Sequence, residues 1–117
     1  MSRIFHIARR EDWTAAVEDG EYRISTLGRT LDEVGFIHCS TDRQVQRVAD
    51  TFYRGLTDLV LITLETDRIG SPLRFDPVGN EQYPHIYGPL NVDAAIRVTP
   101  LATGPDGRIE IPSLQGD

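Results

Sequence analysis

The segment from Asp58 to Glu65 constrains the fold more than any other part of the sequence. It reads Asp-Leu-Val-Leu-Ile-Thr-Leu-Glu, and its first half is continuously apolar. Apolar residues at consecutive positions are typical of a β-strand that is covered on both faces. We therefore expect a strand here, at the centre of a sheet.

Other strands are predicted from alternation or from short apolar runs. Residues Arg3–Ala8 alternate as a half-buried strand, in which His6 points away from Phe5 and Ile7. Residues 35–40 are apolar and few enough to form a buried strand. Pro100 has no N–H to donate, so its strand should end at a sheet edge or a bulge. Further short strands are expected over Pro72–Asp76, Tyr83–Tyr87, Ala95–Leu101 and Arg108–Ile111, the last two joined by a turn at Pro105-Asp106-Gly107.

Two helices are predicted, and the second has the clearer pattern. The first covers Trp13–Val17, after the acidic pair Glu11-Asp12, and ends at Gly20. The second begins at Ser40-Thr41 and ends at Gly55. Its start carries a capping box of Thr41 and Gln44, and its apolar stripe comprises Val45, Val48, Ala49, Phe52 and Tyr53.

These patterns predict an α+β fold. We expect a single domain over residues 1–117, with a flexible C-terminal tail over 112–117. It should contain two or three helices and one split sheet of about six strands, mixed or antiparallel. Hydrophobic residues make up 39% of the chain and charged residues 26%, as is usual for a globular domain.

Composition excludes several classes of function. The chain carries twelve basic and eighteen acidic residues, and every basic residue is arginine. Without lysine there is no Schiff-base chemistry and no Walker-type phosphate lysine. The net charge of −6 repels nucleic acid and anionic lipid, so we expect neither as a partner. A small anionic ligand held by one or two arginines remains compatible with this charge.

Cysteine content and apolar runs suggest the compartment. The single cysteine, Cys39, excludes an internal disulfide and a cysteine-based zinc site. No run approaches the roughly 20 apolar residues of a membrane span, and the first residues lack a secretory pattern. We therefore expect a cytoplasmic protein.

Three histidines, His6, His38 and His85, are the candidates for acid–base chemistry. Each lies in or beside a predicted strand with aromatic or apolar neighbours. Imidazole titrates near neutral pH, so a converging set suits proton transfer. The alternative is that each is a partly buried histidine bonded to a backbone carbonyl. None has the His-x-x-x-His spacing of a metal site, and we expect no bound metal.

The residues around two of these histidines extend the candidate site. Cys39 should face the core if His38 faces a site, because neighbouring strand residues point to opposite faces. Ser40-Thr41, at a predicted helix N-terminus, could bind an anion or only cap the helix. Residues 83–90 place His85 and Tyr87 on one face of a proline-restricted strand, which suggests a pocket wall or an aromatic sheet edge. Arg74 could bind an anionic ligand or pair with a carboxylate.

These segments, in this order, resemble a family of small bacterial proteins known as domain-of-unknown-function family nine-five-two. The resemblance runs from Ile4-Phe5-His6-Ile7 through Trp13, residues 35–40 and Gln44 to residues 84–90. That family is distantly similar to the ADP-ribosyltransferase fold, a split α+β sheet that holds NAD in a central cleft. The resemblance therefore implies a nucleotide-type ligand.

The resemblance also implies roles for three strands. In ADP-ribosyltransferases an early strand supplies a His or Arg that contacts the nicotinamide ribose. A second strand supplies an aromatic or hydroxyl residue, and a late strand supplies a glutamate. On this basis His6 takes the first position, residues 38–40 the second and residues 85–87 the third. The third position lacks the glutamate here. Glu65, Asp76 and Glu81 are nearby in sequence and could supply the charge from another element.

We therefore expect a histidine-lined cleft for NAD, ADP-ribose or a ribose phosphate, on which the protein acts as a transferase. The alternative is a catalytically inactive module that binds a small ligand or a protein on the same fold. No resident cofactor and no oligomeric state are assigned. The catalytic residues should be His6, His38 and His85, converging within roughly 10 Å. The expected ligand-binding residues are Trp13, Phe36, Ser40, Thr41, Gln44, Arg74 and Tyr87.

Overall fold

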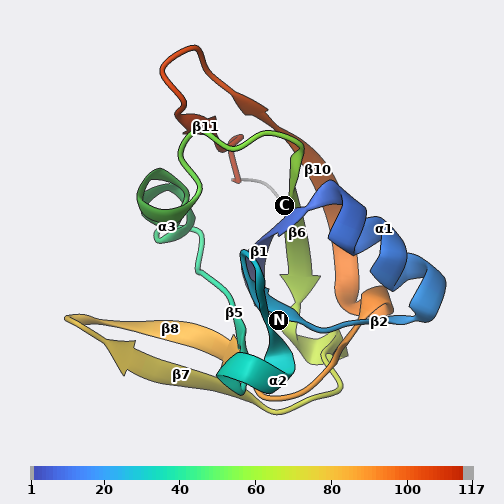
Figure 1. The fold of residues 1–117 in the computed structure, drawn as a ribbon. Helices are drawn as coiled ribbons and strands as arrows, with labels where there is room; N and C mark the ends of the chain where they lie inside the picture. Colours follow the sequence, from blue (N-terminus) through green and yellow to red (C-terminus); the bar gives the residue numbers. More distant parts are fainter. Residues whose placement is uncertain (1, 115–117) are drawn as a thin grey trace.

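A four-stranded antiparallel sheet forms the centre of the computed structural model, which describes residues 2–114 (Figure 1). Its order is β1-β6-β10-β11, so β6 lies between two neighbours, as predicted for the apolar segment. The bounds are β1 Arg3–Arg9, β6 Leu59–Glu65, β10 Ala95–Thr103 and β11 Ile109–Glu110. The expected α+β class is confirmed.

A second antiparallel sheet has the order β5-β8-β7 and carries a long hairpin that projects from the body (Figure 1). Its strands are β5 Ile37–His38, β7 Leu73–Val78 and β8 Glu81–Ile86. One bridge joins it to β1, where the N–H of Phe5 donates to the Ser40 carbonyl and the N–H of Ser40 to the Phe5 carbonyl, both at 2.8 Å. The expected split of the sheet therefore lies between β1 and β5.

Shorter elements connect these sheets. Two two-stranded ladders pair β2 with β9 and β3 with β4, and every strand pair in residues 2–114 is antiparallel. The ladder strands are β2 Glu21–Tyr22, β3 Ile24–Thr26, β4 Arg29–Thr30 and β9 Leu90–Asn91. Two 3₁₀ turns, Thr66–Arg68 and Val92–Ala94, complete the connections.

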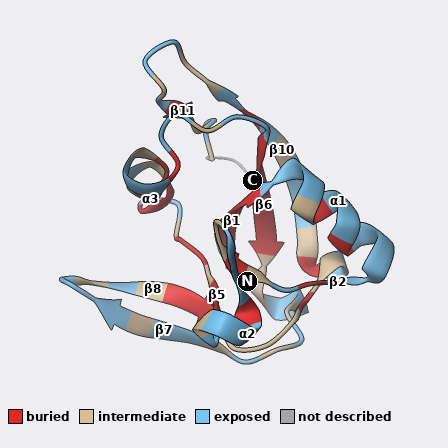
Figure 2. Ribbon diagram, viewed as in Figure 1, coloured by how far each residue is buried: buried red, intermediate tan, exposed pale blue. Residues whose placement is uncertain are grey.

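Helices cover both faces of the central sheet. Helix α1, Arg10–Asp19, packs on one face and α3, Val45–Phe52, on the other (Figures 1 and 2). Strand β1 sends Ile4 and Ala8 to the α1 side and Phe5 and Ile7 to the α3 side. The alternation is as predicted, but the expectation of a half-buried strand is wrong, because both faces of β1 are covered and its residues from Ile4 to Ala8 are all buried.

Helix α1 ends at Gly20 as predicted, but α3 begins later than its sequence pattern suggested. The first α3 residue is Val45; Thr41 donates its backbone N–H to the Gln44 amide oxygen at 3.0 Å, which is one half of the predicted box. Ser40 is in the bridge to β1 and not at a helix N-terminus. Phe52 was predicted in the buried stripe, yet it is 66% exposed.

Helix α2, Leu31–Val34, is not among the helices whose ranges were predicted from the sequence. It carries a complete capping box: the Glu33 N–H donates to the Thr30 hydroxyl oxygen at 3.3 Å and the Thr30 N–H to a Glu33 carboxylate oxygen at 2.9 Å. Gly35 ends the helix with a φ of +97°. This turn places the following residue, Phe36, directly before the first β5 residue, Ile37.

The predicted final strand and the position of Pro100 at a sheet edge are confirmed. Strand β11 pairs with Ala102 and Thr103 but does not reach Pro100, which therefore lies on an edge stretch of β10. Of the predicted tail, Leu114 packs against the α3-side core, and residues 115–117 lie outside the described residues. Within residues 2–114 no helix combines the length and apolar character that crossing a membrane requires.

Candidate functional site

His38 and His85 lie directly opposite each other on β5 and β8. Nδ1 of His38 is 3.3 Å from Nε2 of His85. Antiparallel pairing puts both imidazoles on one face of the second sheet, although they are far apart in the chain. Phe36 stacks on the His85 ring with a centroid distance of 3.9 Å.

Asp76 extends this pair from the neighbouring strand β7. Its Oδ2 atom lies 2.8 Å from Nδ1 of His85 and also accepts a hydrogen bond from the Tyr87 hydroxyl. The hydrogen bonds from Tyr87 and His85 lower the pKa of Asp76, because they stabilise the ionised carboxylate. Asp76 is therefore charged at neutral pH.

The hydrogen bonds constrain the protonation of both rings. The Asp76 carboxylate only accepts, so His85 donates from Nδ1; in the neutral form of His85, Nε2 then accepts from Nδ1–H of His38. Burial, and secondarily the neighbouring His85, lowers the pKa of His38 to about 4. His38 is thus neutral at pH 7 with a lone pair on Nε2, for which no hydrogen-bond partner is found among residues 2–114.

A pocket of about 310 Å³ opens beside these rings. Both histidines line it, and most of the other walls are apolar; Arg29 is the charged residue at its wall. This combination of apolar walls with a few polar groups is typical of small-molecule sites. The lining residues are Thr26, Leu27, Arg29, Val34, Phe36, His38, Val48, Phe52, Tyr53, Val78 and His85.

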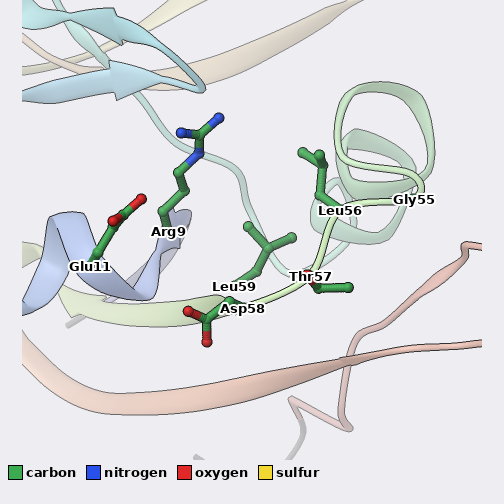
Figure 3. A pocket seen from close by; sticks show the side chains of 7 residues that line it. All are labelled: Arg9, Glu11, Gly55, Leu56, Thr57, Asp58 and Leu59. Carbon is green, nitrogen blue, oxygen red and sulfur yellow. The ribbon is translucent and has the colours of Figure 1, made fainter.

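Another hollow, of about 290 Å³, lies at the start of β6 and has a different character. Figure 3 shows Arg9 and Glu11 on one side of it and Leu56, Asp58 and Leu59 on the other. Asp58 forms an ion pair with Arg10 at 2.8 Å. No histidine lines this hollow. The candidate site is therefore the pocket of His38 and His85.

His6 does not line that pocket. It is 2% exposed and lies on the α1 side of β1, where its Nδ1 is 2.6 Å from the His38 carbonyl oxygen and its Nε2 is 2.8 Å from the Tyr22 hydroxyl. The three predicted histidines are thus connected, but only two of them face the cavity. His6 contacts the backbone of His38.

The predicted ligand-binding residues divide in the same way. Phe36 lines the pocket. Tyr87 does not line it, but donates a hydrogen bond to Asp76, which in turn bonds to the lining residue His85. Arg74 is exposed, with its guanidinium 5.2 Å from the centre of the Tyr87 ring. The other predicted residues do not line the pocket. Trp13 packs against Tyr22 in the core, and Ser40 and Thr41 form hydrogen bonds through their backbone. The side chain of Gln44 is buried and donates to the Gln82 carbonyl at 2.8 Å.

Sequence patterns could have identified some of the remaining site residues. Alternation along β7 puts Arg74, Asp76 and Val78 on one face. Of the three carboxylates suggested from the sequence, Glu65, Asp76 and Glu81, only Asp76 bonds to a histidine among the described residues. Glu81 instead pairs with Arg47 and Glu65 with Arg3. Tyr22 and Leu27 carry no comparable signal, because Tyr22 lies in a two-residue strand and Leu27 in the turn between β3 and β4. Cys39 is buried as predicted, and burial raises the pKa of its thiol.

Among residues 2–114 no group of three or more His, Cys, Asp or Glu side chains is placed to hold a metal ion. The facing nitrogens of His38 and His85 are 3.3 Å apart. Both imidazoles can form hydrogen bonds and transfer protons.

The chain is similar to solved structures of one bacterial protein, CC0527 from Caulobacter crescentus. A crystal structure of CC0527 is 32% identical, covers 93% of this chain and 94% of that chain, and superposes with a TM-score of 0.83. The solution NMR structure of CC0527 is also 32% identical, covers 93% of this chain and 91% of that chain, and has a TM-score of 0.76. A comparison with curated proteins gives no match.

A family model matches residues 7–98, which include His38, Asp76, His85 and Tyr87. The family is described as protein of unknown function. Since the match covers most of the chain, this protein belongs to the family Protein of unknown function (DUF952).

Proposed function

We propose that the pocket binds a small nucleotide-type ligand such as NAD or ADP-ribose, and that His38 accepts a proton during transfer at its ribose. The observation that carries this proposal is the chain of hydrogen bonds from Asp76 through His85 to His38, which leaves Nε2 of His38 unprotonated beside the cavity. A neutral imidazole with its other nitrogen hydrogen-bonded is the arrangement of a general base.

Asp76 can replace the glutamate that ADP-ribosyltransferases carry on a late strand. A cationic histidine beside a developing positive charge on the ribose would be unfavourable. Here burial keeps His38 neutral, and the negative charge of Asp76 lies behind His85. On the proposed ADP-ribosyltransferase-like fold, the missing glutamate is therefore compensated by a carboxylate that acts through His85 and His38.

The proposed reaction breaks the bond between C1′ of the ribose and nicotinamide. The bonding electrons leave with nicotinamide, and the oxygen of an acceptor hydroxyl or of water forms the new bond to C1′. The acceptor's proton passes to Nε2 of His38. His38 can then release its Nδ1 proton to Nε2 of His85, whose positive charge is stabilised by Asp76.

The pocket's size and lining support this ligand class. Its volume of about 310 Å³ is at the small end of ligand cavities and suits one ring system with its sugar. Leu27, Val34 and Phe52 provide apolar surface for a flat ring, and Arg29 provides a positive charge for a phosphate.

Thermal unfolding with NAD, ADP-ribose and AMP tests the proposal. A ligand present at 100 times its dissociation constant adds about 2.7 kcal/mol of stability, which is readily measured as a shift in Tm. We expect such a shift in the wild type, its loss in His38→Ala and a smaller shift in Phe52→Ala. Phe75→Ala, an exposed change on β7 outside the pocket, is the control and should retain the full shift. An unchanged shift in His38→Ala would show that the assigned role is wrong.

The absence of the late glutamate favours a second candidate, a ligand-binding module without catalysis. Both candidates predict the thermal shift, so turnover separates them. Release of nicotinamide from NAD, followed by chromatography, should depend on His38 and Asp76 if the protein is a transferase or hydrolase. Ligand-induced stabilisation without nicotinamide release in any condition would indicate the binding module.

A further inference from the structure

The two sheets part beside His38, and the side chain of His6 lies in the gap. The backbone of Ser40 is bonded to Phe5, and the same register would oppose His38 to Ile7. No such pair forms. Instead, the His38 carbonyl oxygen lies 2.6 Å from Nδ1 of His6. The backbone of His38 is therefore held from the β1 side by a side chain rather than by a strand ladder.

The surroundings of His6 allow it only one role in this contact. Burial lowers the pKa of His6 to about 4, so the ring is neutral and has one donor and one acceptor. The His38 carbonyl can only accept, which assigns the proton to Nδ1. Nε2 then accepts from the hydroxyl of Tyr22, a residue that is 1% exposed and whose pKa is raised by burial. Both polar atoms of the His6 ring are thereby satisfied.

Tyr22 is itself firmly placed. Its ring makes an edge contact with His6 at 5.1 Å between centroids and lies 5.5 Å from the ring of Trp13 on α1. Its backbone pairs with Leu90 in the β2–β9 ladder. A rigid path of contacts therefore runs from α1 and β2 through His6 to the backbone of His38.

We infer that His6 and Tyr22 form a positioning pair that sets the backbone of His38 and thereby directs its Nε2 atom into the pocket. Neither residue lines the cavity, so the pair acts through His38 and not on the ligand. The inference rests on the proposed function only in taking His38 as the group that meets the ligand. Its geometry can be measured without any ligand.

Two substitutions of His6 separate the two hydrogen bonds. The amide nitrogen of asparagine takes nearly the position of Nδ1, so His6→Asn can still donate to the His38 carbonyl but loses the contact with Tyr22. The amide of glutamine reaches the position of Nε2, so His6→Gln can still bond to Tyr22 but leaves the carbonyl without its donor. Tyr22→Phe removes only the hydroxyl and is a third variant with the carbonyl contact intact.

Nitrogen NMR of the histidine rings in the full-length protein provides the readout. The titratable groups that face His38 are His85, Tyr83 and His6. In the wild type we expect His38 to carry its proton on Nδ1 and to titrate at about 4. His6→Asn and Tyr22→Phe should preserve both properties. In His6→Gln the ring of His38 should leave its buried position beside His85. Its pKa should then rise toward its ordinary value of 6.5, with a mixture of the two neutral tautomers.

An unchanged tautomer and pKa of His38 in folded His6→Gln would overturn the inference. If that variant does not fold, the wild-type spectrum decides: His6 must carry its proton on Nδ1, and a proton on Nε2 contradicts the proposed contact. The thermal-shift experiment tests the proposed function independently of this NMR result. If the tautomer and pKa of His38 do not change in His6→Gln and the wild type binds a nucleotide, only the positioning pair is rejected. If they change but the wild type binds no nucleotide, only the proposed function is rejected.

Discussion

His38 and Cys39 are adjacent in the chain but differ completely in chemical availability. The cysteine side chain is 1% exposed, and burial raises the pKa of its thiol, so the nucleophilic thiolate is not formed at neutral pH. The histidine points to the opposite face of β5, lines the pocket and is bonded to His85. Strand alternation thus decides which of the two reactive side chains faces the pocket.

At the same scale, Tyr87 should control the ionisation of Asp76. The hydrogen bond from the Tyr87 hydroxyl is the largest cause of the lowered pKa of Asp76, ahead of the bond from His85. We expect Tyr87→Phe to raise the pKa of Asp76 toward its ordinary value, measured by carbon NMR of the carboxyl group. Tyr83→Phe is the matched control, because Tyr83 lies opposite Asp76 in the β7–β8 ladder but is not among the groups that lower its pKa. Equal pKa values of Asp76 in wild type and Tyr87→Phe would refute this assignment.

At the scale of elements, the pocket depends on short segments that have little stability of their own. Helix α2 has four residues and β5 has two, yet Phe36 lies in the short link between them and β5 carries His38. The capping box at Thr30 and the hydrogen bond from the Gly35 N–H to the Leu31 carbonyl at 2.7 Å define both ends of α2. Local turn chemistry, rather than a long apolar pattern, therefore positions one wall of the pocket.

Gly35 is the residue at which this element can be tested. Its φ of +97° lies in the left-handed region, and a Cβ added there would meet no atom within 4 Å. Gly35→Ala should therefore lower the free energy of unfolding by about 1 kcal/mol through backbone strain alone. Gly35→Asn should cost less, since asparagine tolerates this conformation. Urea denaturation measures both variants, and equal losses for alanine and asparagine would contradict a backbone origin.

At the scale of the whole molecule, the central sheet separates two hydrophobic cores that contribute differently to the candidate site. The core on the α1 side encloses the His6–Tyr22 contact, whereas the α3 side contributes Val48 and Tyr53 to the pocket. Figure 2 shows the buried residues concentrated on the central strands, with the hairpin tip exposed. The site thus lies at the junction of the well-packed body and the projecting hairpin.

Buried neutral histidines make the stability of the whole fold depend on pH. His6 has a pKa of about 4 in the folded protein and an ordinary value of 6.5, so between these values the unfolded chain binds a proton that the folded chain does not. Stability should therefore be complete above pH 6.5 and fall as the pH is lowered toward 4, by about 3 kcal/mol for His6 alone.

Urea denaturation midpoints measured from pH 7.5 to 4.5 test this expectation. His6→Asn, which carries no titratable ring at this position, should show a shallower loss of stability over the same range. A wild-type midpoint that does not change with pH would contradict the buried neutral state of His6.

The sequence by itself determined the elements whose signals are local. The apolar run of Leu59–Glu65, the alternation of β1, the glycine at the end of α1 and the turn before β11 all follow from patterns within a few residues. The same patterns indicated His38 and His85 as candidates. They misjudged Phe52 and the start of α3, because side-chain periodicity does not tell which part of a helix is covered.

Only the tertiary structure decided which of these residues meet. The register of β5 against β8 brings His38 and His85 together, and the hairpin to β7 adds Asp76. The gap between β1 and β5 places His6 behind the pocket instead of inside it. Strand register and the splitting of a sheet are set by contacts between distant segments, and such contacts leave no periodic trace in the amino-acid sequence.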